Sequence, residues 1–414
     1  MTSTVSLRHL RAFITVAELG SVTRAADALY RAQSAITRSV HELETVIGES
    51  LFERKSSGML LTVFGNTLLF RARRAAQEFE LARDEIYSKI KTPTGAMKTS
   101  ILSMLFNERR LQIFVKLAES HHMPTVANAL GITQPAVSAS ISDLETSLGA
   151  TLFQRTPKGM LLTEAGALLL FRAKRALAEL RHAEADISAL KGTTQGRVVV
   201  GALPLSRTTI LPRAIASVIA AHPQLRITTI EGPFDSLAAR LRAGDIDFIL
   251  GALRPPEYAN DLHGEPLLED KMSVIVRRGH PLTQKSKVTL DDMMRAQWIL
   301  SSKGTPARAL FESSMSRKDM PAPTEVVETS DLAILRGLLL HSDMVTAISA
   351  QQLEYEIHSN ALQVLDFDLP RTSRTIGITQ REESHPSPGA VVLMDAIREV
   401  ATQMERRAAN SGHW

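Results

Sequence analysis

Two short stretches of the chain carry polar and basic side chains at a spacing that places them on one face of a helix. Guanidinium, imidazole, amide and hydroxyl groups arranged in this way can bond to the base edges and phosphates of a DNA groove. The candidate contact residues of the first stretch are Gln33, Ser34, Ala35, Thr37, Arg38 and His41. Those of the second stretch are Gln134, Pro135, Ser138 and Ser140.

Each stretch follows two shorter helical patterns. Apolar residues at helical spacing predict a first helix that stops at Gly20, and Ser21 can cap a second helix that runs to Leu29. Ser34 is the expected N-cap of the third helix, and Pro135 is the expected first residue of the corresponding helix. Two short helices followed by a helix with an outward polar face form a helix-turn-helix.

The arrangement occurs twice because the first half of the chain contains one sequence twice. Residues 8–86 align without a gap onto residues 109–187, and the run that begins at Gly58 reappears at Gly159, a constant shift of 101 positions. A period this long indicates a duplicated domain and not a solenoid.

The two copies differ on the predicted reading face. Ala139 stands at the position of Arg38, so the second helix lacks a cation there. The two helices therefore cannot have identical base preferences, and an asymmetric DNA site is expected instead of a perfect palindrome.

A compact block with a glycine turn follows each third helix, over residues 48–62 and 149–163, and indicates a β-hairpin wing. Its basic residues can contact phosphates, although each of them can equally be an ordinary solvated charge. These residues are Arg54, Lys55, Arg155 and Lys158. A long helix rich in Ala, Leu and Arg is then predicted over residues 65–90 and 164–190.

Composition limits the possible classes of protein. A chain of 414 residues with 44% hydrophobic content suffices for roughly two to four domains. The absence of cysteine excludes disulfides, thiolate nucleophiles and Cys-ligated zinc. No stretch resembles a membrane span or a signal peptide, so a cytoplasmic protein is expected. Residues 1–192 hold 24 Lys and Arg against 18 Asp and Glu, whereas the remainder holds 24 against 26, so the basic excess lies in the duplicated half.

From residue 197 onward, predicted strands alternate with helices, which indicates a parallel sheet covered on both faces. Strands are expected at 225–230 and 246–251, with helices at 208–221 and 237–241. Ligands of such sheets bind beyond the carboxyl ends of the strands, where helix N-termini favour anions. The candidate ligand-binding residues are Leu203, Pro204, Leu205, Ser206, Arg207, Thr208, Gly251, Ser302, Lys303, Gly304, Thr305, Ser330 and Thr346. They suit a small organic acid, for example an aromatic one, although the hydroxyl residues can also be simple helix caps.

The chain resembles the LysR-type transcriptional regulators. Both copies are similar to the winged helix-turn-helix of that family, in residues 33–36 and 51–54 of the first copy and 134–138 and 162–166 of the second. Residues 241–248 and 280–282 are similar to its effector domain.

The resemblance implies a multidomain fold: two α-rich winged helix-turn-helix domains with long linker helices, followed by a two-lobed α/β effector domain, which is Rossmann-like and related to periplasmic binding proteins. The expected parts are residues 1–64, 65–99, 100–163, 164–192 and 193–414. The family's linker helices pair. Here the tether at residues 91–99 is long enough, on the order of 30 Å, for a pair within one chain. The alternatives are that each copy pairs with a different chain, or that one copy is a vestigial packing element.

The implied function is a nucleoid-associated regulator that binds operator DNA and is controlled by a small-molecule effector. The candidate site residues lead us to expect a carboxylate as that effector. Expected partners are RNA polymerase and further copies of the chain, as a dimer or tetramer, with no cofactor, metal or membrane. An enzyme is disfavoured because no catalytic or phosphate-binding motif is present and the pair His121-His122 has no clustered third ligand. The alternatives are an architectural DNA-binding protein without ligand control and a solute-binding protein that lacks an export signal.

Overall fold

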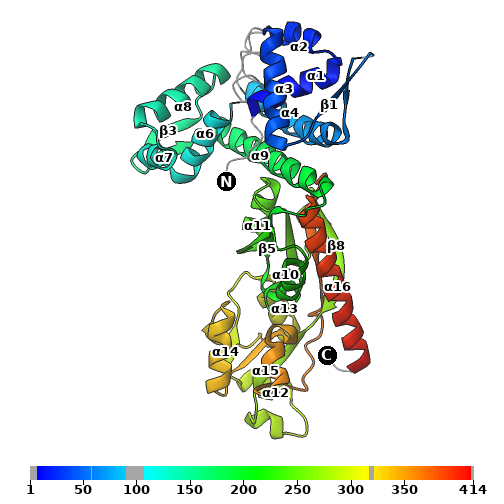
Figure 1. Ribbon diagram of the computed structural model, residues 1–414. Helices are drawn as coiled ribbons and strands as arrows, with labels where there is room; N and C mark the ends of the chain where they lie inside the picture. The colour runs from blue at the N-terminus through cyan, green and yellow to red at the C-terminus, as the bar shows by residue number, and fades with distance from the viewer. Residues whose placement is uncertain (1–6, 57, 90–106, 317–320, 412–414) are drawn as a thin grey trace.

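The computed structural model describes residues 7–56, 58–89, 107–316 and 321–411. Two helical units lie at one end of the molecule, and a two-lobed α/β part extends away from them (Figure 1). Two long helices, α4 (Val63–Lys89) and α9 (Glu164–Leu190), join the units to each other and to the α/β part.

The two helical units have the same order of elements. The first contains α1 (Leu7–Leu19), α2 (Val22–Leu29), α3 (Gln33–Ile47), β1 (Phe52–Lys55) and β2 (Gly58–Leu61). The second contains α6 (Glu108–Ser120), α7 (Met123–Leu130), α8 (Gln134–Leu148), β3 (Phe153–Thr156) and β4 (Gly159–Leu162). In each unit the two strands form an antiparallel hairpin at the position predicted for a wing.

The helix caps differ in part from the prediction. Ser21 caps α2 and accepts a hydrogen bond from the backbone of Arg24 at 3.4 Å, as predicted. The prediction of Ser34 as the N-cap of α3 is wrong, because the backbone is already helical at residue 33 and the N-cap is Ala32. Pro135 likewise occupies the second helical position and not the first, since α8 begins at residue 134.

A glutamate ties each hairpin to the helix before it. Glu44 of α3 accepts hydrogen bonds at 2.8 and 3.4 Å from two successive backbone N–H groups at the start of the hairpin. Glu145 of α8 makes the same two bonds at 2.7 and 3.1 Å. Each glutamate therefore holds the start of its hairpin against the third helix.

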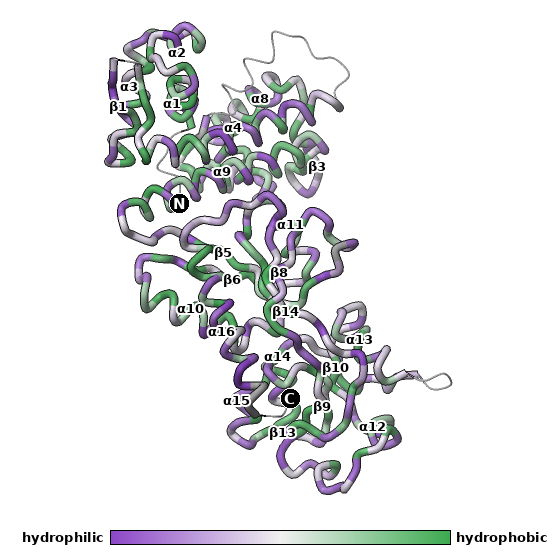
Figure 2. Tube along the Cα trace, turned by 90° about the vertical axis from the view of Figure 1, so that its right-hand side faces the viewer, coloured by the Kyte–Doolittle hydropathy of each residue, from purple (hydrophilic) through white to green (hydrophobic). Residues whose placement is uncertain are grey.

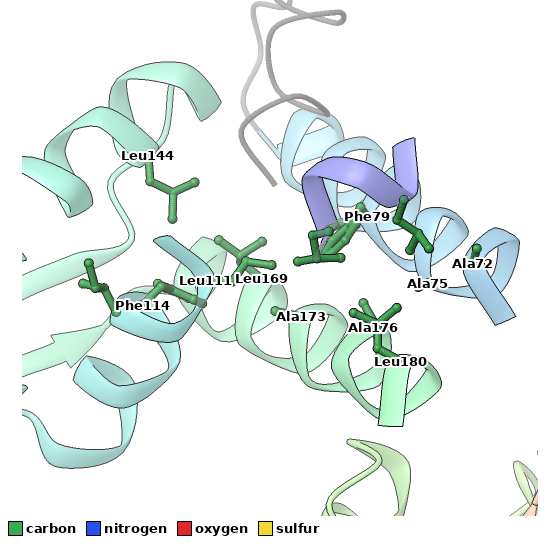
Figure 3. Packing of buried hydrophobic residues seen from close by; sticks show 14 of the residues in the cluster. Ala72, Ala75, Phe79, Leu111, Phe114, Leu144, Leu169, Ala173, Ala176 and Leu180 are labelled. Atoms are coloured by element: carbon green, nitrogen blue, oxygen red, sulfur yellow. The ribbon is translucent and has the colours of Figure 1, made fainter. Parts of the chain in front are cut away.

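The helices α4 and α9 pack side by side (Figure 3). Ala72 and Ala75 of α4 and Ala173 and Ala176 of α9 are all fully buried in this contact. The shift of 101 residues relates the two pairs of alanines, so both helices present the same stripe. The small side chains let the two backbones approach closely, and Phe79 fills the space beside them.

Ion pairs fix the direction of this helix pair. Arg71 lies 2.6 Å from Asp186 and 3.0 Å from Glu179, and the side chains of Arg71 and Glu179 are only 4% and 6% exposed. The shift by 101 residues turns this cluster into a second one, which consists of Arg172, Glu78 and Glu85. Because each arginine faces the carboxylates of the other copy, the two helices run antiparallel.

The α/β part consists of two lobes, each with a mixed five-stranded sheet. Lobe I has the strand order β6-β5-β7-β14-β8, in which β5, β6 and β7 are parallel. Its strands are β5 (Gly196–Ala202), β6 (Leu225–Glu231), β7 (Phe248–Ala252), β8 (Leu262–Asp270) and β14 (Arg374–Arg381), and its helices are α10 (Ile210–Ala221), α11 (Phe234–Arg242) and α16 (Pro388–Ser411). Figure 2 shows the hydrophobic character of β5 and β14 inside this lobe.

Lobe II has the strand order β11-β10-β12-β9-β13. Its strands are β9 (Met272–Arg277), β10 (Trp298–Leu300), β11 (Glu325–Glu328), β12 (Val345–Ser349) and β13 (Leu362–Val364), and its helices are α12 (Leu290–Arg295), α13 (Pro306–Met315), α14 (Leu332–His341) and α15 (Glu354–His358). The chain crosses between the lobes twice, from β8 to β9 and from β13 to β14. The strands and helices predicted for lobe I are present, with ends shifted by up to three residues.

Lobe I is attached to α9 by polar contacts. The imidazole of His182 lies 3.0 Å from the carboxylate of Asp247, and Lys174 lies 2.8 Å from Asp245. His182 is buried, and Asp247 also accepts a hydrogen bond from the backbone of Val199 in β5 at 2.7 Å. Asp247 therefore contacts both the linker helix and the first strand of the lobe.

The loop after β14 attaches lobe I to α4 as well. Arg71 donates a hydrogen bond to the carbonyl oxygen of His385 at 2.8 Å, and Arg74 donates one to that of Glu383 at 3.0 Å. The ring of Phe70 packs edge-on against His385, with centroids 4.9 Å apart. One end of the helix pair is thus covered by lobe I.

The tether predicted at residues 91–99 lies outside the described residues. The predicted linker helices agree closely with α4, expected at 65–90, and with α9, expected at 164–190. Within the described ranges, no helix is both long enough and apolar enough to cross a membrane.

Replacing Arg71 by Met is expected to lower the free energy of unfolding by about 3–5 kcal/mol, since Glu179 then stays buried without this partner. The matched change Arg172→Met is expected to cost less, because that side chain is 15% exposed and water screens its partners. Urea unfolding of both variants checks the ranking, and equal losses would contradict it.

The loss of unfolding free energy in Arg71→Met should also depend on pH. Burial raises the pKa of Glu179, but the ion pairs with Arg74 and Arg71 outweigh burial and hold the pKa below its ordinary value. The ion pairs of Glu179 therefore stabilise the fold fully above the pKa that this carboxyl has in the unfolded chain. This stabilisation is lost as the pH falls through the lower pKa that Glu179 has in the folded protein. The difference between wild type and Arg71→Met should accordingly shrink in acid.

Candidate nucleic-acid interface and ligand site

The outer faces of α3 and α8 are open to solvent. The side chain of Arg38 is 81% exposed. The other exposed residues predicted to contact DNA are Gln33, Ser34, Thr37, His41, Gln134, Pro135 and Ser138. Ala35 is half-buried, and the backs of the two helices pack on the unit cores through Ile36 and Val137. Each helix therefore offers a polar face whose size suits a DNA groove.

Ser140 does not belong to the exposed face, contrary to the prediction. Its hydroxyl oxygen is buried and has no hydrogen-bond partner among the described residues. Ser39, at the same position of α3, is buried as well. The reason is helical spacing, because Ser140 follows the buried Val137 by three positions and so lies on the same side of α8.

The two reading faces carry different ion pairs. On α3, Arg38 lies 2.8 Å from Glu42, and Glu42 lies 3.1 Å from His9 of α1. On α8 the arginine is absent, and Asp143 pairs with Arg110 of α6 at 3.0 Å. An exposed pair of this kind is weak, so Arg38 can leave its carboxylate for a phosphate or a guanine.

The basic residues of the two hairpins are exposed. Arg54 and Lys55 lie at the end of β1, and Arg155 and Lys158 lie on β3 and the turn after it. Lys55 pairs with Glu53 of the same strand at 3.2 Å, with both side chains 57% exposed. Such solvated charges can bind phosphates without first breaking a strong interaction.

The sequence predicts a turn between α2 and α3, at residues 30–33, but sequence reasoning overlooked how the two copies differ there. Tyr30 has a φ of 52°, and its side chain is 92% exposed. The corresponding residue of the second unit is Gly131, with a φ of 62°. The signal was present in the alignment of the two copies, because a tyrosine replaces a glycine at a position that needs left-handed backbone.

The adjacent residues His121 and His122 lie in the turn between α6 and α7, and both side chains make hydrogen bonds there. His121 Nδ1 lies 3.1 Å from the carbonyl oxygen of Met160, and His122 Nδ1 lies 2.9 Å from the hydroxyl of Thr125. In the part of the chain that the structure describes, no three His, Asp or Glu side chains gather in a group that could hold a metal ion.

The first predicted ligand segment forms a short 3-10 helix, η1 (Pro204–Arg207), directly after β5. Leu203, Leu205 and Ser206 are buried there. The hydroxyl of Ser206 donates to the carbonyl oxygens of Leu203 at 2.8 Å and Leu250 at 3.1 Å. Ser206 therefore stabilises the turn and does not present a donor to a ligand, contrary to the prediction.

The remaining residues of this segment are more accessible. Pro204 is exposed, and Arg207 and Thr208 are half-buried. Arg207 donates to the carbonyl oxygen of Ala202 at 2.9 Å, and burial lowers the pKa of its guanidinium. Thr208 reaches the carbonyl oxygen of Gln351 in lobe II at 3.4 Å, so this segment lies where the two lobes meet.

In lobe II, the structure brings two of the predicted serines together. The backbone N–H of Ser302 donates to the hydroxyl of Ser330 at 3.3 Å, and the two hydroxyls are 3.4 Å apart. Lys303 is 69% exposed and pairs with Glu325 at 3.2 Å, and Gly304 is exposed. These residues form an open polar edge after β10.

Two other hydroxyls of lobe II have structural partners. Thr305 caps α13: its oxygen accepts from the backbone of Arg308 at 3.3 Å and donates to the carbonyl of Ser302 at 2.7 Å. Thr346 is fully buried and donates to the carbonyl oxygen of Ile299 at 2.8 Å. Neither hydroxyl is free for a ligand, in contrast to the prediction, because each is needed to satisfy backbone groups.

The lobes are joined by polar residues that sequence reasoning did not find. Arg213 of lobe I lies 3.3 Å from Glu354 of lobe II. At the crossover, the buried Asp270 accepts from Ser349 at 2.5 Å and from Arg374 at 2.9 Å, and burial raises the pKa of this carboxyl. The partners are separated by 79 to 141 positions in sequence, so no local pattern reveals them.

Two groove-sized polar helices, a helix pair that holds them and a two-lobed α/β domain together define a DNA-binding regulator that responds to a small molecule. The family profile described as "LysR substrate binding domain" matches residues 191–402. The profile described as "Bacterial regulatory helix-turn-helix protein, lysR family" matches residues 7–66 and again residues 109–167. The chain belongs to the LysR family of transcriptional regulators. It is a DNA-binding regulator with an effector-binding domain and not an enzyme.

Curated relatives are similar over different shares of the chain. The HTH-type transcriptional regulator GalR of Pseudomonas putida is 50% identical over 398 residues, which cover 96% of this chain and 98% of GalR. The regulator PcaQ of Agrobacterium fabrum is 29% identical and covers 72% of this chain and 95% of its own length.

Solved structures agree in fold. Full-length OxyR of Pseudomonas aeruginosa, in a variant form, aligns with a TM-score of 0.53 at 25% identity, over 70% of this chain and 93% of OxyR. CbnR, a LysR family transcriptional regulator, aligns with a TM-score of 0.52 at 19% identity, over 71% and 98%. These likenesses support a LysR-type fold with an N-terminal helix-turn-helix and a two-sheet substrate-binding domain.

Replacing Gly251 by Ala is expected to disturb the turn after β5. Gly251 has a φ of +149°, and a Cβ there would meet the Cβ of Leu203 at 2.4 Å. The added methyl should push the Leu203 turn and lower the free energy of unfolding by about 2–4 kcal/mol. Gly304→Ala is the matched control, because its φ is +81° but nothing lies within 4 Å of the added Cβ. Calorimetric unfolding of both variants checks this, and an equal loss would count against the clash.

Proposed function

We propose that the chain reads one operator with two duplicated winged helix-turn-helix heads, which are hereafter the first head (residues 7–61) and the second head (residues 107–162). The double match to the family's helix-turn-helix profile supports this proposal. The relatives support it too. PcaQ aligns over nearly its whole length with only 72% of this chain, whereas GalR aligns with almost all of it. A second head accounts for the difference.

The antiparallel pairing of α4 and α9 is the observation that carries this proposal. Each of these helices has 27 residues and is therefore about 40 Å long. Since the heads are attached to opposite ends of the pair, their separation is on the scale of one DNA turn, roughly 35 Å. One chain thus suits two successive half-sites on the same side of a duplex.

The two half-sites should differ in sequence. The first head presents Arg38, which can form two hydrogen bonds with a guanine, while the second head presents Ala139 beside Ser138. An asymmetric operator therefore fits one chain better than a perfect palindrome does.

The effector that we propose is a small organic acid bound where the strands of the two lobes end. Arg207 follows β5, and Arg254 follows the neighbouring strand β7. Burial lowers the pKa of both guanidinium groups, and neither forms an ion pair among the described residues. A bound carboxylate would compensate these charges, with Thr208, Ser302 and Ser330 as additional hydrogen-bonding groups.

The effector would act by favouring one arrangement of the two lobes. The strand β14 begins at Arg374 in the crossover and leads into the loop that contacts Arg71 and Arg74 on α4. A shift of this strand would change how lobe I holds the helix pair, and hence the spacing of the heads. We further propose that the regulator contacts RNA polymerase, assembles as a dimer or tetramer through its effector domains, and acts in the cytoplasm on nucleoid DNA.

Arg38→Ala tests the reading face of the first head. Loss of one good base contact should weaken binding to a duplex selected by the wild-type chain from a random library by about 1–3 kcal/mol. Arg295→Ala is the control, since it removes an 80% exposed charge from lobe II. Binding isotherms at several salt concentrations give both affinity and salt dependence. If Arg38→Ala changes neither, α3 is not the reading helix.

Isothermal titration calorimetry tests the effector class. Small aliphatic and aromatic carboxylates are compared with neutral and cationic compounds of the same size. Only carboxylates should bind, and Arg207→Met should weaken that binding by roughly tenfold or more, because a charge-assisted hydrogen bond is lost. Heat from neutral or cationic compounds alone would overturn the proposal.

A further inference from the structure

The turn between the second and third helices differs between the heads at three successive positions. The first head has Tyr30, Arg31 and Ala32, where the second head has Gly131, Ile132 and Thr133. Both turns have the same backbone path, since Tyr30 and Gly131 share the left-handed conformation. The difference therefore lies in the side chains.

Each of the three residues makes the turn of the first head less stable than its counterpart does. Tyr30 adopts a φ of 52° that a glycine adopts without strain. Arg31 replaces Ile132, which packs against the hydrophobic core. Ala32 provides no side-chain cap for α3, whereas Thr133 accepts a hydrogen bond from the backbone at the start of α8 at 3.4 Å.

The turn of the first head lacks the glycine, the core contact and the helix cap that the second head has. Folding stability therefore does not explain its sequence. Strained backbone of this kind is concentrated at functional sites. The side chain of Tyr30 is 92% exposed, so packing within the chain does not account for it. A binding partner that contacts the exposed tyrosine and arginine would explain why these residues occupy the turn.

The surroundings of Arg31 are positively charged. Burial lowers the pKa of His9, and Arg8, Arg31 and Arg38 lower it further, whereas Glu42 is the one group that raises it. Burial also lowers the pKa of Arg11, and the charge of Arg31 adds to that effect. Glu42 is the one carboxylate in this set of interactions, and it already pairs with Arg38 and His9, so Arg31 is left to favour an anionic partner.

The second head lacks three of the four arginines in this set of interactions. Gln112, Ile132 and Ala139 stand at the positions of Arg11, Arg31 and Arg38, whereas Arg109 matches Arg8 and Arg110 replaces His9. The anionic partner is therefore one that the first head binds and the second head does not bind in the same way. The turn lies directly before the N-terminus of α3, and in a helix-turn-helix this end of the reading helix enters the groove while the preceding helix crosses the DNA backbone.

We propose that Tyr30 and Arg31 form a DNA-backbone contact that is present in the first head and absent from the second. Arg31 pairs with a phosphate, and the phenol of Tyr30 donates a hydrogen bond to the same strand beside the half-site. The contact makes the first head the tighter of the two on the operator. This inference rests on the proposed function, in which both heads bind one duplex.

The test uses the full chain and a duplex selected from a random library by the wild-type protein. Arg31→Ile and Tyr30→Gly give the first head the residues of the second. Arg31→Ile should lower the slope of log K against log salt by about 0.9, the value for one phosphate. Tyr30→Gly should weaken binding roughly tenfold with little change of slope, while thermal unfolding stays the same or shifts upward because the backbone strain is removed.

Single introduced cysteines show which head loses its DNA contact. Each can be labelled selectively, because the natural chain contains no cysteine. Ala28→Cys in α2 and Ala129→Cys at the equivalent position of α7 are both exposed and each carry an iron chelate that cleaves nearby DNA. Arg31→Ile should reduce cleavage from position 28 at moderate salt and leave cleavage from position 129 largely unchanged. Arg295→Ile controls for the loss of an exposed charge.

The outcomes distinguish a failure of the proposed function from a failure of the backbone contact. If the wild-type chain selects no duplex, or if only one of the two labels cleaves DNA, the proposal of two heads on one operator fails. If both labels cleave but Arg31→Ile leaves the salt slope and the cleavage pattern unchanged, only the backbone contact is overturned. A loss of affinity that accompanies a lower unfolding temperature in Tyr30→Gly would also overturn it, because the turn would then be structural.

Discussion

The antiparallel direction of α4 and α9 is the constraint on which the rest of the molecule depends. Because the helices come from one duplicated sequence, a parallel, in-register pair would place Arg71 against Arg172 and Glu78 against Glu179. Like charges in a poorly hydrated contact repel strongly. The antiparallel arrangement converts each clash into an ion pair, and it sends the two helical units to opposite ends of the helix pair.

The same duplication makes the helix pair nearly symmetric, yet only one α/β part is available to cover it. Lobe I contacts Arg71 and Arg74 through backbone carbonyls. The equivalent arginine, Arg172, donates its hydrogen bonds to the carboxylates of Glu78 and Glu85 and, among the described residues, to no carbonyl of the lobes. Under the proposed mechanism, a change in the lobes would therefore act on one end of a nearly symmetric helix pair, and the two heads would respond differently.

Local patterns predicted most elements well, since apolar spacing and Ser21 suffice to place α1 to α3, and the alternation of strands and helices suffices for lobe I. Local patterns failed where tertiary contacts determine which way a side chain points. Whether Ser206 faces a ligand depends on carbonyl groups of β7, and Ser140 is turned inward by the core that Val137 joins. The contact of Arg71 with His385 spans 314 positions, so no reading of the chain along its length could have revealed it.

Pairing within one chain has a consequence for how such a protein can change over generations. In a symmetric homodimer, every substitution in a reading helix appears in both subunits at once, so the two DNA half-sites must change together. Here the two heads are encoded separately, so residue 139 is alanine while residue 38 is arginine. Under the proposed binding of one operator by both heads, each half of a promoter would drift with its own head, and the ratio of the two heads stays at one to one at any cellular concentration.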